Sequence, residues 1–320
     1  MRVLANTLEE FMQQIAKAIV NRYLGTNPQK ITSLGGGWYG RVFLAEMTTE
    51  PTKVIIKIHL FPNLAKKEAC QLEVLATHAT VKMPDVFFVH KATPDIPNDA
   101  IIMEYIPGFN AGNHNLLEIK EKNRVAIAEQ IVDNLLSYHK VINPDGFGEI
   151  GANSFEPDWK KWYKTKADGA LSKAESFYVS GKIDDVIFSV IRKAHELYDR
   201  IFYLPVKEAR LIHGDYNTWN ILLDENLMHV SAVIDPLNSC FADSEMDLYQ
   251  LNHANGKDYK LLDIYASKFP LSENFSLKLS FYELFDHITG FYDANIEIDY
   301  PFMAALAKEL EQQMQNFGLL

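Results

Sequence analysis

The chain has 320 residues, of which 48% are apolar and 23% are charged, a composition typical of a globular protein with room for two hydrophobic cores. Its formal net charge of −11 argues against a nucleic-acid partner, which would need a basic footprint, and is compatible with a cationic small-molecule substrate. The chain has no apolar run near the ~18 residues that span a bilayer, no signal-peptide pattern in its first residues and only two cysteines, so we expect a cytoplasmic protein without a membrane span.

The first predicted elements are a helix and a glycine-rich strand pair. Apolar residues recur at the spacing of one helix face over residues 7–23. Residues 31–45 then indicate two strands joined by a loop, whereas a dinucleotide site would need a strand followed by a helix. A glycine loop between two strands can place backbone N–H groups over phosphates, although a ligand-free hairpin would show the same glycines. The residues of interest in this loop are Gly35, Gly37, Gly40 and Val42.

The next predicted strand, residues 54–59, carries a lysine within an apolar run. A charged residue in such a run needs a partner or an exposed face. A helix predicted over residues 63–78 contains Glu68 and Glu73, which point about 140° away from each other because they are five residues apart. Only one of them can therefore face Lys57, and we expect it to be Glu68. A lysine on an exposed edge of the sheet is the alternative.

The pattern changes from strands to helices at a hinge. Residues 85–90 and 100–106 indicate two more strands, and Pro107-Gly108 follows the second. We therefore expect an N-terminal lobe over residues 1–106, with one helix against a mostly antiparallel sheet, and a C-terminal lobe over residues 107–320. The helices predicted in the second lobe lie at about 121–140, 157–179, 183–203, 245–253, 258–268, 274–292 and 302–316.

The strongest chemical signal lies at the centre of the second lobe. His213-Gly-Asp215 interrupts an apolar stretch, Asn220 follows five residues after Asp215, and a β-hairpin predicted over residues 221–234 ends at Asp235. Two carboxylates and an amide that converge on one hairpin mouth suit a nucleotide-bound Mg²⁺ and a hydroxyl that is to be deprotonated. An ordinary turn before a strand would explain His-Gly-Asp alone, but not all three residues in register.

Together these features resemble the kinase signature set in its usual order. Within that superfold, the chain resembles small-molecule kinases of the aminoglycoside phosphotransferase and choline kinase superfamily more than protein kinases. Asp235 is followed by Pro236-Leu237 instead of Phe-Gly, and no Ala-Pro-Glu closes an activation segment. Asp243 comes only eight residues after Asp235, which leaves no room for a long peptide-docking loop.

Within this superfamily, the chain is most similar to the fructosamine (ketosamine) kinase family. The segments that carry this likeness are 68–75, 81–86, 146–148, 158–163, 235–236, 244–248 and 265–271. The chain departs from the family in the catalytic loop. The family usually has His-Gly-Asp-Leu-Trp-x-Gly-Asn, whereas this chain has Tyr216-Asn-Thr-Trp219 between Asp215 and Asn220, which alters the acceptor side of the loop.

The resemblance implies an α+β, two-lobed protein-kinase-like fold, with a small N-terminal antiparallel sheet lobe, one key helix and a larger, mostly helical C-terminal lobe. It implies ATP and Mg²⁺ as cofactors and a small polar acceptor with a hydroxyl group, a ketosamine in the first instance. In this scheme Asp215 accepts the hydroxyl proton or orients the hydroxyl, and Asn220 and Asp235 hold Mg²⁺. Lys57, fixed by Glu68, positions the phosphates.

The same resemblance places the glycine loop and Val42 over the nucleotide, and backbone groups of Glu104 and Ile106 beside the adenine. An aminoglycoside-type or choline-type amino-alcohol kinase is the alternative enzyme, and an inactive nucleotide-binding scaffold is the alternative from another class. Tyr216 and Trp219 can stack on a sugar or pack in the protein. The oligomeric state is not readable from the sequence. Three further carboxylates can cap a helix or bind an amine: Asp243, Glu245 and Asp247.

Overall fold

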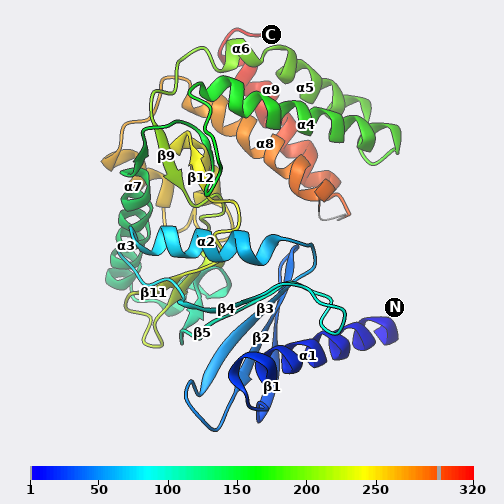
Figure 1. Ribbon diagram of the computed structural model, residues 1–320. Helices are drawn as coiled ribbons and strands as arrows, with labels where there is room; N and C mark the ends of the chain where they lie inside the picture. The colour runs from blue at the N-terminus through cyan, green and yellow to red at the C-terminus, as the bar shows by residue number, and fades with distance from the viewer. Residues whose placement is uncertain (1, 294–296) are drawn as a thin grey trace. The chain divides into compact units, whose positions relative to one another are not determined.

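The computed structural model describes residues 2–293 and 297–320, which form two compact units (Figure 1). The first unit runs to Ile127 and also contains Trp219–Leu237, and the second contains Ala128–Thr218 and the chain from Asn238 onward. The predicted fold class is confirmed, with an antiparallel sheet in one unit and mostly helices in the other. The units are not the two contiguous segments 1–106 and 107–320, because the hairpin after the catalytic loop belongs to the first unit.

A five-stranded antiparallel sheet, in the order β1-β2-β3-β5-β4, forms the first unit. Its strands are β1 (Lys30–Gly35), β2 (Gly40–Glu46), β3 (Lys53–His59), β4 (Val86–His90) and β5 (Ala100–Glu104). Helix α1 (Arg2–Leu24) covers one face, where Val54, Ile56 and Ile58 of β3 enter its apolar core. Because side chains alternate along a strand, Lys57 and His59 point to the opposite face.

Helix α2 (Leu64–Ala76) lies on that opposite face, against β3, β4 and β5. Its start is fixed by Asp99, whose carboxylate accepts the N–H of Asn63 at 2.5 Å and the N–H of Ala92 at 2.8 Å. Asn63 itself has a left-handed backbone, with φ of 66°. The helix therefore begins at a defined residue, and its buried face includes Glu68.

The hairpin of the first unit forms a second sheet, in the order β11-β10-β6. Its strands are β6 (Phe109–Asn110), β10 (Ile221–Leu223) and β11 (Val230–Val233). Gly108 has φ of 152°, and a Cβ there would lie 2.3 Å from the carbonyl oxygen of Leu223, so only glycine fits. The N–H of Val233 donates to the carbonyl of Lys82 at 2.9 Å, which ties the hairpin to the segment between α2 and β4.

Four helices pack as a bundle in the second unit (Figure 1). They are α4 (Trp159–Val179), α5 (Asp185–Glu196), α8 (Phe275–Asp293) and α9 (Tyr300–Asn316). Aspartate side chains cap three of them, because each accepts a backbone N–H at a helix start: Asp158, Asp184 and Asp299. The remaining helical segments are α3 (Glu121–His139), α6 (Tyr198–Ile201), α7 (Leu261–Lys268) and the 3₁₀ segments η1 (Ala111–Asn113), η2 (Leu116–Glu118), η3 (Thr218–Asn220) and η4 (Ser244–Asn252).

A small antiparallel sheet, in the order β7-β9-β12-β8, carries the catalytic loop in the second unit. Its strands are β7 (Ile142–Asn143), β8 (Gly148–Glu149), β9 (Ala209–Ile212) and β12 (Cys240–Ala242). β9 leads directly into His213, so the strand sets where the loop begins. Within the described ranges, no helix combines the length and apolar character that a bilayer crossing requires.

Candidate functional site

Lys57 links two carboxylates in the first unit. Its ammonium donates to Glu68 Oε1 at 2.7 Å and to Asp235 Oδ1 at 2.5 Å. Glu73, the alternative partner on α2, is exposed. Lys57 is only 6% exposed. Burial disfavours the ammonium, but the charges of Asp235 and Glu68 outweigh burial and hold the pKa of Lys57 above its ordinary value. A cation thus stays charged where the helix, the sheet and the hairpin meet.

The other oxygen of the Glu68 carboxylate lies beside a histidine. His59 Nε2 is 3.3 Å from Glu68 Oε2, and both side chains are buried. Burial, helped by the charge of Lys57, lowers the pKa of His59 to about 4, so this imidazole is neutral near pH 7. Burial also raises the pKa of Glu68 to about 7, although Lys57 pulls it down. Two different partners therefore flank the two carboxylate oxygens of Glu68.

The glycine loop joins β1 to β2, as the sequence predicts. Gly35 has φ of 92°, and the register of the two strands shifts beside it. A Cβ on Gly36 would lie 2.3 Å from the carbonyl oxygen of Gly40, so this glycine, outside the predicted set, is the one most strictly required. Arg41 donates to the carbonyls of Gly37 and Gly40 at 3.0 and 2.9 Å and holds the loop in shape. Val42 pairs with Lys57 across the strands.

Asn220 and Asp235 lie at the two ends of the β10–β11 hairpin. The N–H of Ile234 donates to the carbonyl of Asn220 at 3.0 Å, which brings the two ends together. Asp235 has φ of 60°, an uncommon value for a residue with a side chain. The side chains of Asn220 and Asp235 offer one amide oxygen and one carboxylate, a partial ligand set that would suit Mg²⁺ because this ion is usually bound through one or two carboxylates together with substrate phosphates. The described residues contain no cluster of three or more His, Cys, Asp or Glu side chains that would form a complete metal cage.

Glu104 ends β5, and Ile106 follows in the connecting segment. Lys82 makes an ion pair with the Glu104 carboxylate at 2.8 Å, and the N–H of Asp85 donates to it at 3.3 Å. The Glu104 side chain is thus engaged at the end of β5, and the backbone groups predicted to face adenine run from that strand end toward Gly108.

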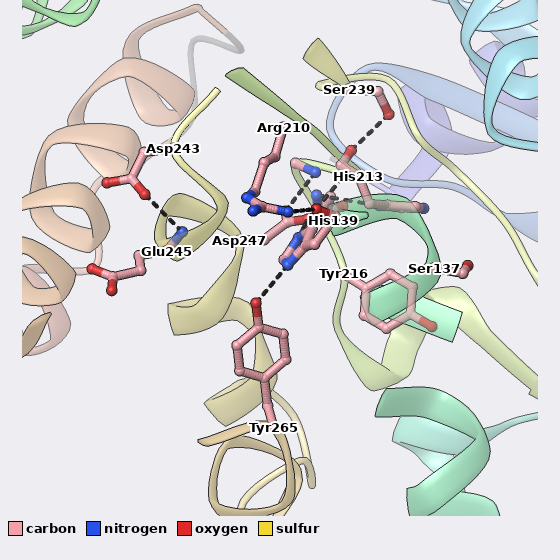
Figure 2. A network of polar contacts seen from close by, with 12 residues as sticks. Ser137, His139, Arg210, His213, Tyr216, Ser239, Asp243, Glu245, Asp247 and Tyr265 are labelled. Atoms are coloured by element: carbon pink, nitrogen blue, oxygen red, sulfur yellow. Dashed lines mark hydrogen bonds and ion pairs between the residues drawn. The ribbon is translucent and has the colours of Figure 1, made fainter. Parts of the chain in front are cut away.

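The catalytic loop is held by a buried carboxylate in the second unit. Asp247 accepts the backbone N–H of His213 at 2.8 Å and that of Gly214 at 2.6 Å, while Ser239 donates its hydroxyl to the His213 carbonyl at 2.9 Å (Figure 2). Gly214 has φ of 80°, and a Cβ there would lie 2.5 Å from the carbonyl of Asn238. The side chains of Asp247 and Ser239 therefore hold the turn before Asp215.

A second layer of polar contacts supports Asp247. His139 lies between Tyr265, whose hydroxyl is 2.8 Å from Nδ1, and Asp247, whose Oδ2 is 3.3 Å from Nε2 (Figure 2). Arg210 donates to the carbonyl of His139. Asp247 therefore serves the catalytic loop directly, instead of capping a helix or binding an amine.

Asp215 itself is contacted by its own loop. Asn217 Nδ2 donates to Asp215 Oδ1 at 2.7 Å, and the N–H of Asp215 lies 3.3 Å from His213 Nδ1. His213 thus supports the backbone of the loop. Tyr216 is fully buried, donates to the carbonyl of Ile131 at 2.8 Å and accepts from the Asn134 side chain at 3.0 Å, which makes it a packing residue. Trp219 in the first unit is half exposed.

Asp243 and Glu245 form a buried ion cluster with a residue from α8. Lys278 Nζ lies 2.7 Å from each carboxylate. Burial opposes its charge, but the two carboxylates outweigh burial and raise the pKa of Lys278. Asp243 also accepts the N–H of Glu245 at 3.1 Å, as a capping residue would, and the hydroxyl of Tyr282 at 2.8 Å. These carboxylates therefore have partners within the unit.

The structure brings together Lys57, Glu68 and Asp235, with Asn220 at the other end of the Asp235 hairpin, whereas Asp215 belongs to the second unit. The sequence predicts no role for several residues of these networks, among them His59, Asn217 and Lys278. A histidine two residues after Lys57 on a strand was a usable signal, because both side chains had to share a face. Lys278 meets Asp243 and Glu245 from another helix, so no local pattern reveals its partners.

The sequence matches a known protein family. The pattern of the phosphotransferase enzyme family (APH) matches residues 30–259. The uncharacterized protein YcbJ of Escherichia coli K12 is 23% identical over 241 residues, which cover 74% of this chain and 78% of YcbJ.

Solved structures give the same result for the fold. A candidate fructosamine-3-kinase from Haemophilus somnus 129PT superposes with a TM-score of 0.69 at 17% identity over 95% of this chain and 96% of that one. The aminoglycoside phosphotransferase APH(4)-Ia, in complex with ADP and hygromycin B, has a TM-score of 0.65 at 15% identity over 93% and 97% of the two chains. The predicted resemblance is confirmed: the chain belongs to the phosphotransferase enzyme family.

Proposed function

We propose that the protein transfers the γ-phosphoryl group of ATP to a hydroxyl of a small polar acceptor, with a ketosamine as the preferred acceptor class. The observation that carries this proposal is the buried ammonium of Lys57, which contacts both Glu68 and Asp235. A buried lysine between a helix carboxylate and the carboxylate at the end of a hairpin is the arrangement that positions nucleotide phosphates in kinases.

The nucleotide half of the reaction is assigned to the first unit. Lys57 orients the α- and β-phosphates, and Glu68 keeps its ammonium in place. The loop from Gly35 to Gly40 covers the phosphates with its backbone N–H groups. Asn220 and Asp235 would hold Mg²⁺, which supplies charge neutralisation at the phosphates when it is bound. The backbone from Glu104 to Ile106 receives the adenine.

Asp215 is assigned to the acceptor hydroxyl. Its carboxylate accepts the hydroxyl proton or orients the hydroxyl for in-line attack on the γ-phosphorus. Positioning and charge neutralisation dominate such reactions, and general-base help contributes on the order of 10²–10⁴-fold. Asp215 and Asn220 are five positions apart in the sequence, so the chain itself keeps their Cα atoms within about 18 Å of each other.

The ketosamine assignment is supported by the sequence segments shared with the fructosamine kinase family and by the fold shared with a candidate fructosamine-3-kinase. The altered loop between Asp215 and Asn220 favours the second candidate, an aminoglycoside-type or amino-alcohol kinase. Trp219, which is half exposed, is the aromatic side chain of this loop that an acceptor can reach, because Tyr216 is buried. In both cases the net charge of −11 suits a cationic acceptor.

Two variants test the roles. Asp215→Asn should abolish phosphoryl transfer and leave Mg²⁺–ATP affinity within about twofold, because the removed charge acts on the acceptor. Asp235→Ala should lose Mg²⁺–ATP binding. Asp263→Asn, which changes an exposed carboxylate, is the control and should behave as wild type. Wild-type turnover by Asp215→Asn would refute the assigned role, and an absence of Mg²⁺–ATP binding by the wild-type protein would refute the proposal.

The acceptor is tested by coupled ADP release with three groups of compounds: fructoselysine-type ketosamines, aminoglycosides and amino alcohols. The proposal predicts the highest kcat/KM for a ketosamine. A higher value for an aminoglycoside or an amino alcohol would replace the ketosamine assignment with the second candidate. ATP binding without turnover of any acceptor would favour the inactive scaffold.

A further inference from the structure

A line of hydrogen bonds runs from the catalytic loop to helix α8 within the second unit. Asn217 Nδ2 donates to Asp215 Oδ1 at 2.7 Å and to Gln250 Oε1 at 3.2 Å. Gln250 Nε2 donates to the Tyr249 hydroxyl at 3.0 Å, and that hydroxyl donates to the Asp286 carboxylate. The line therefore begins and ends at a carboxylate, with two amides and a phenol between them.

The direction of each bond follows from its neighbours. A carboxylate only accepts, so Asn217 must turn its NH₂ group toward Asp215 and Tyr249 must turn its hydroxyl hydrogen toward Asp286. The second hydrogen of the Asn217 NH₂ then meets the Gln250 carbonyl, which leaves the Gln250 NH₂ group for the Tyr249 oxygen. Reversal of either amide would place an oxygen against an acceptor. The line thus has one arrangement in which every bond has a donor.

Burial makes this arrangement stable. Asn217, Gln250 and Tyr249 are 5%, 6% and 2% exposed, so water competes little for their hydrogen bonds. Burial, with the nearby charge of Asp286, raises the pKa of Tyr249 well above its ordinary value, so the phenol remains a donor. A buried amide left without its partners would be costly, and each member therefore holds the next in place.

We propose that Asn217 is a positioning residue for Asp215, and that Gln250, Tyr249 and Asp286 act as a relay that fixes the Asn217 amide. The inference rests on the proposed function, in which Asp215 acts on the acceptor hydroxyl. Asn217 holds Oδ1 of Asp215 and so restricts rotation of the carboxylate, which sets the direction in which the carboxylate meets the acceptor hydroxyl. The relay extends this control to α8, where Asp286 is only partly buried.

Asn217 also has a simpler structural role. The N–H of Asn217 donates to the Asp215 carbonyl at 3.0 Å, so Asn217 also belongs to a tight turn and could serve the loop alone. A turn residue would affect stability, whereas a positioning residue affects turnover. If the relay operates, a change at Tyr249 must also act through Asn217. Kinetics of single and double variants separate these accounts.

The experiment measures kcat, the KM for ATP and the melting temperature of four single variants and one double variant of the full chain with its best acceptor. Asn217→Leu keeps the shape of the side chain and removes its donors, Asn217→His restores one ring N–H, and Tyr249→Phe removes only the far hydroxyl. Tyr198→Phe is the matched control, because Tyr198 is equally buried and its hydroxyl donates to the Lys160 carbonyl outside the relay.

We expect Asn217→Leu to lower kcat about 100-fold, the effect of a displaced catalytic group, with the KM for ATP changed less than twofold. Asn217→His should recover part of this loss. Tyr249→Phe should lower kcat about fivefold, the equivalent of one hydrogen bond, whereas Tyr198→Phe should lower only the melting temperature. In the double variant Asn217→Leu/Tyr249→Phe, kcat should equal that of Asn217→Leu, because a broken relay transmits nothing further.

Wild-type kcat in Asn217→Leu, with Asp215→Asn inactive, would overturn the positioning role and leave the proposed function standing. Independent, multiplying losses in the double variant would overturn the relay. Turnover by Asp215→Asn would instead overturn the proposed function. If Asn217→Leu does not fold, Tyr249→Phe still decides the matter, since an unchanged kcat in that variant contradicts the relay.

Discussion

Removal of the Lys57 ammonium should destabilise the protein in a pH-dependent way. Lys57→Met keeps an unbranched side chain of similar length and removes the charge that Glu68 and Asp235 share. The cost depends on how well water can replace the lost cation. Glu68 is 1% exposed and cannot be resolvated, whereas the Asp235 side chain is 38% exposed and is screened by solvent.

The loss of unfolding free energy therefore comes mainly from Glu68. An uncompensated charge left by breaking a buried ion pair costs about 3–5 kcal/mol. If Glu68 takes up a proton instead, the remaining cost is that of a buried carboxyl with an incomplete hydrogen-bond set, about 1–3 kcal/mol. Asp235 adds less than about 1 kcal/mol, as an exposed pair does.

The sign of the pH dependence follows from linkage. Burial raises the pKa of Glu68 from 4.5 to about 7 in the folded wild type, and Lys57 is the group that holds it down to that value. Without Lys57 the folded pKa lies higher still, so the folded variant keeps a proton that its unfolded chain releases. The unfolding free energy of the variant thus continues to fall above pH 7. Ionisation of Glu68 no longer lowers the unfolding free energy of the wild type in that range. Each unit of difference between the folded and unfolded pKa corresponds to about 1.4 kcal/mol.

Urea denaturation followed by circular dichroism, at about pH 6 and about pH 9, tests this reasoning. The loss of unfolding free energy should be about 1–3 kcal/mol at the lower pH and about 3–5 kcal/mol at the higher pH. Lys53→Met is the matched control, because Lys53 lies on the same strand but is exposed. A loss that is equal at the two pH values, or no larger than that of Lys53→Met, would refute the assigned role of Glu68.

Three further changes should have distinct effects. Gly108→Ala should destabilise the protein by more than about 1 kcal/mol, because Gly108 has φ of 152° and a Cβ there would meet Leu223. Gly169→Ala should stabilise it by about 0.5–1 kcal/mol, because Gly169 lies in α4 with open space around it. Equal urea midpoints for the two variants would contradict this. Lys278→Met should lower the unfolding free energy by about 3–5 kcal/mol, because it leaves two buried carboxylates without their cation. The melting temperature should fall in this variant and stay unchanged in Lys308→Met, which alters an exposed lysine. His59→Leu should raise the KM for ATP severalfold with kcat little changed, because Glu68 loses the polar ring beside Oε2, and His59→Gln should restore it; equal KM values for the two variants would show that no polar neighbour of Glu68 is needed.

The sequence predicts the nucleotide half of the candidate site well, because each signal is local. A lysine in an apolar strand needs a partner, and helix geometry allows only one of Glu68 and Glu73 to face it. The glycine loop is predicted between two strands for the same reason, since the residues after it favour a strand. His59 shares the face of Lys57, and the same alternation that places Lys57 also places this histidine.

The short elements of the second unit are not predictable in this way. Strands β7, β8 and β12 have two or three residues, too few for an alternating pattern, and they form only because neighbouring backbone groups are available. The single helix expected over residues 183–203 is two helices, α5 and α6, which are separated by Leu197. Amphipathic spacing continues through such a break and does not reveal it.

The polar networks are the least predictable part. Asp243 and Lys278 are 35 residues apart in sequence, and Asn217 and Gln250 are 33 residues apart. Nothing at either position indicates the other, since the partners meet only after the helices have packed. The role of Asp247 is hidden for a related reason, because acidic residues at a helix start are favoured by the helix dipole in any case.

The proposed function requires transfer of the γ-phosphoryl group from a nucleotide held at Lys57 and Asp235 to an acceptor hydroxyl that Asp215 positions. The most direct measurement incubates the protein with ATP labelled in the γ-phosphoryl group, Mg²⁺ and a ketosamine, and detects the label on the acceptor by mass spectrometry. We predict labelled acceptor with the wild type, none with Asp215→Asn, and equal ATP affinity in both. Labelled acceptor from Asp215→Asn, or ATP that binds equally well to Lys57→Met/Asp235→Ala, would contradict the account.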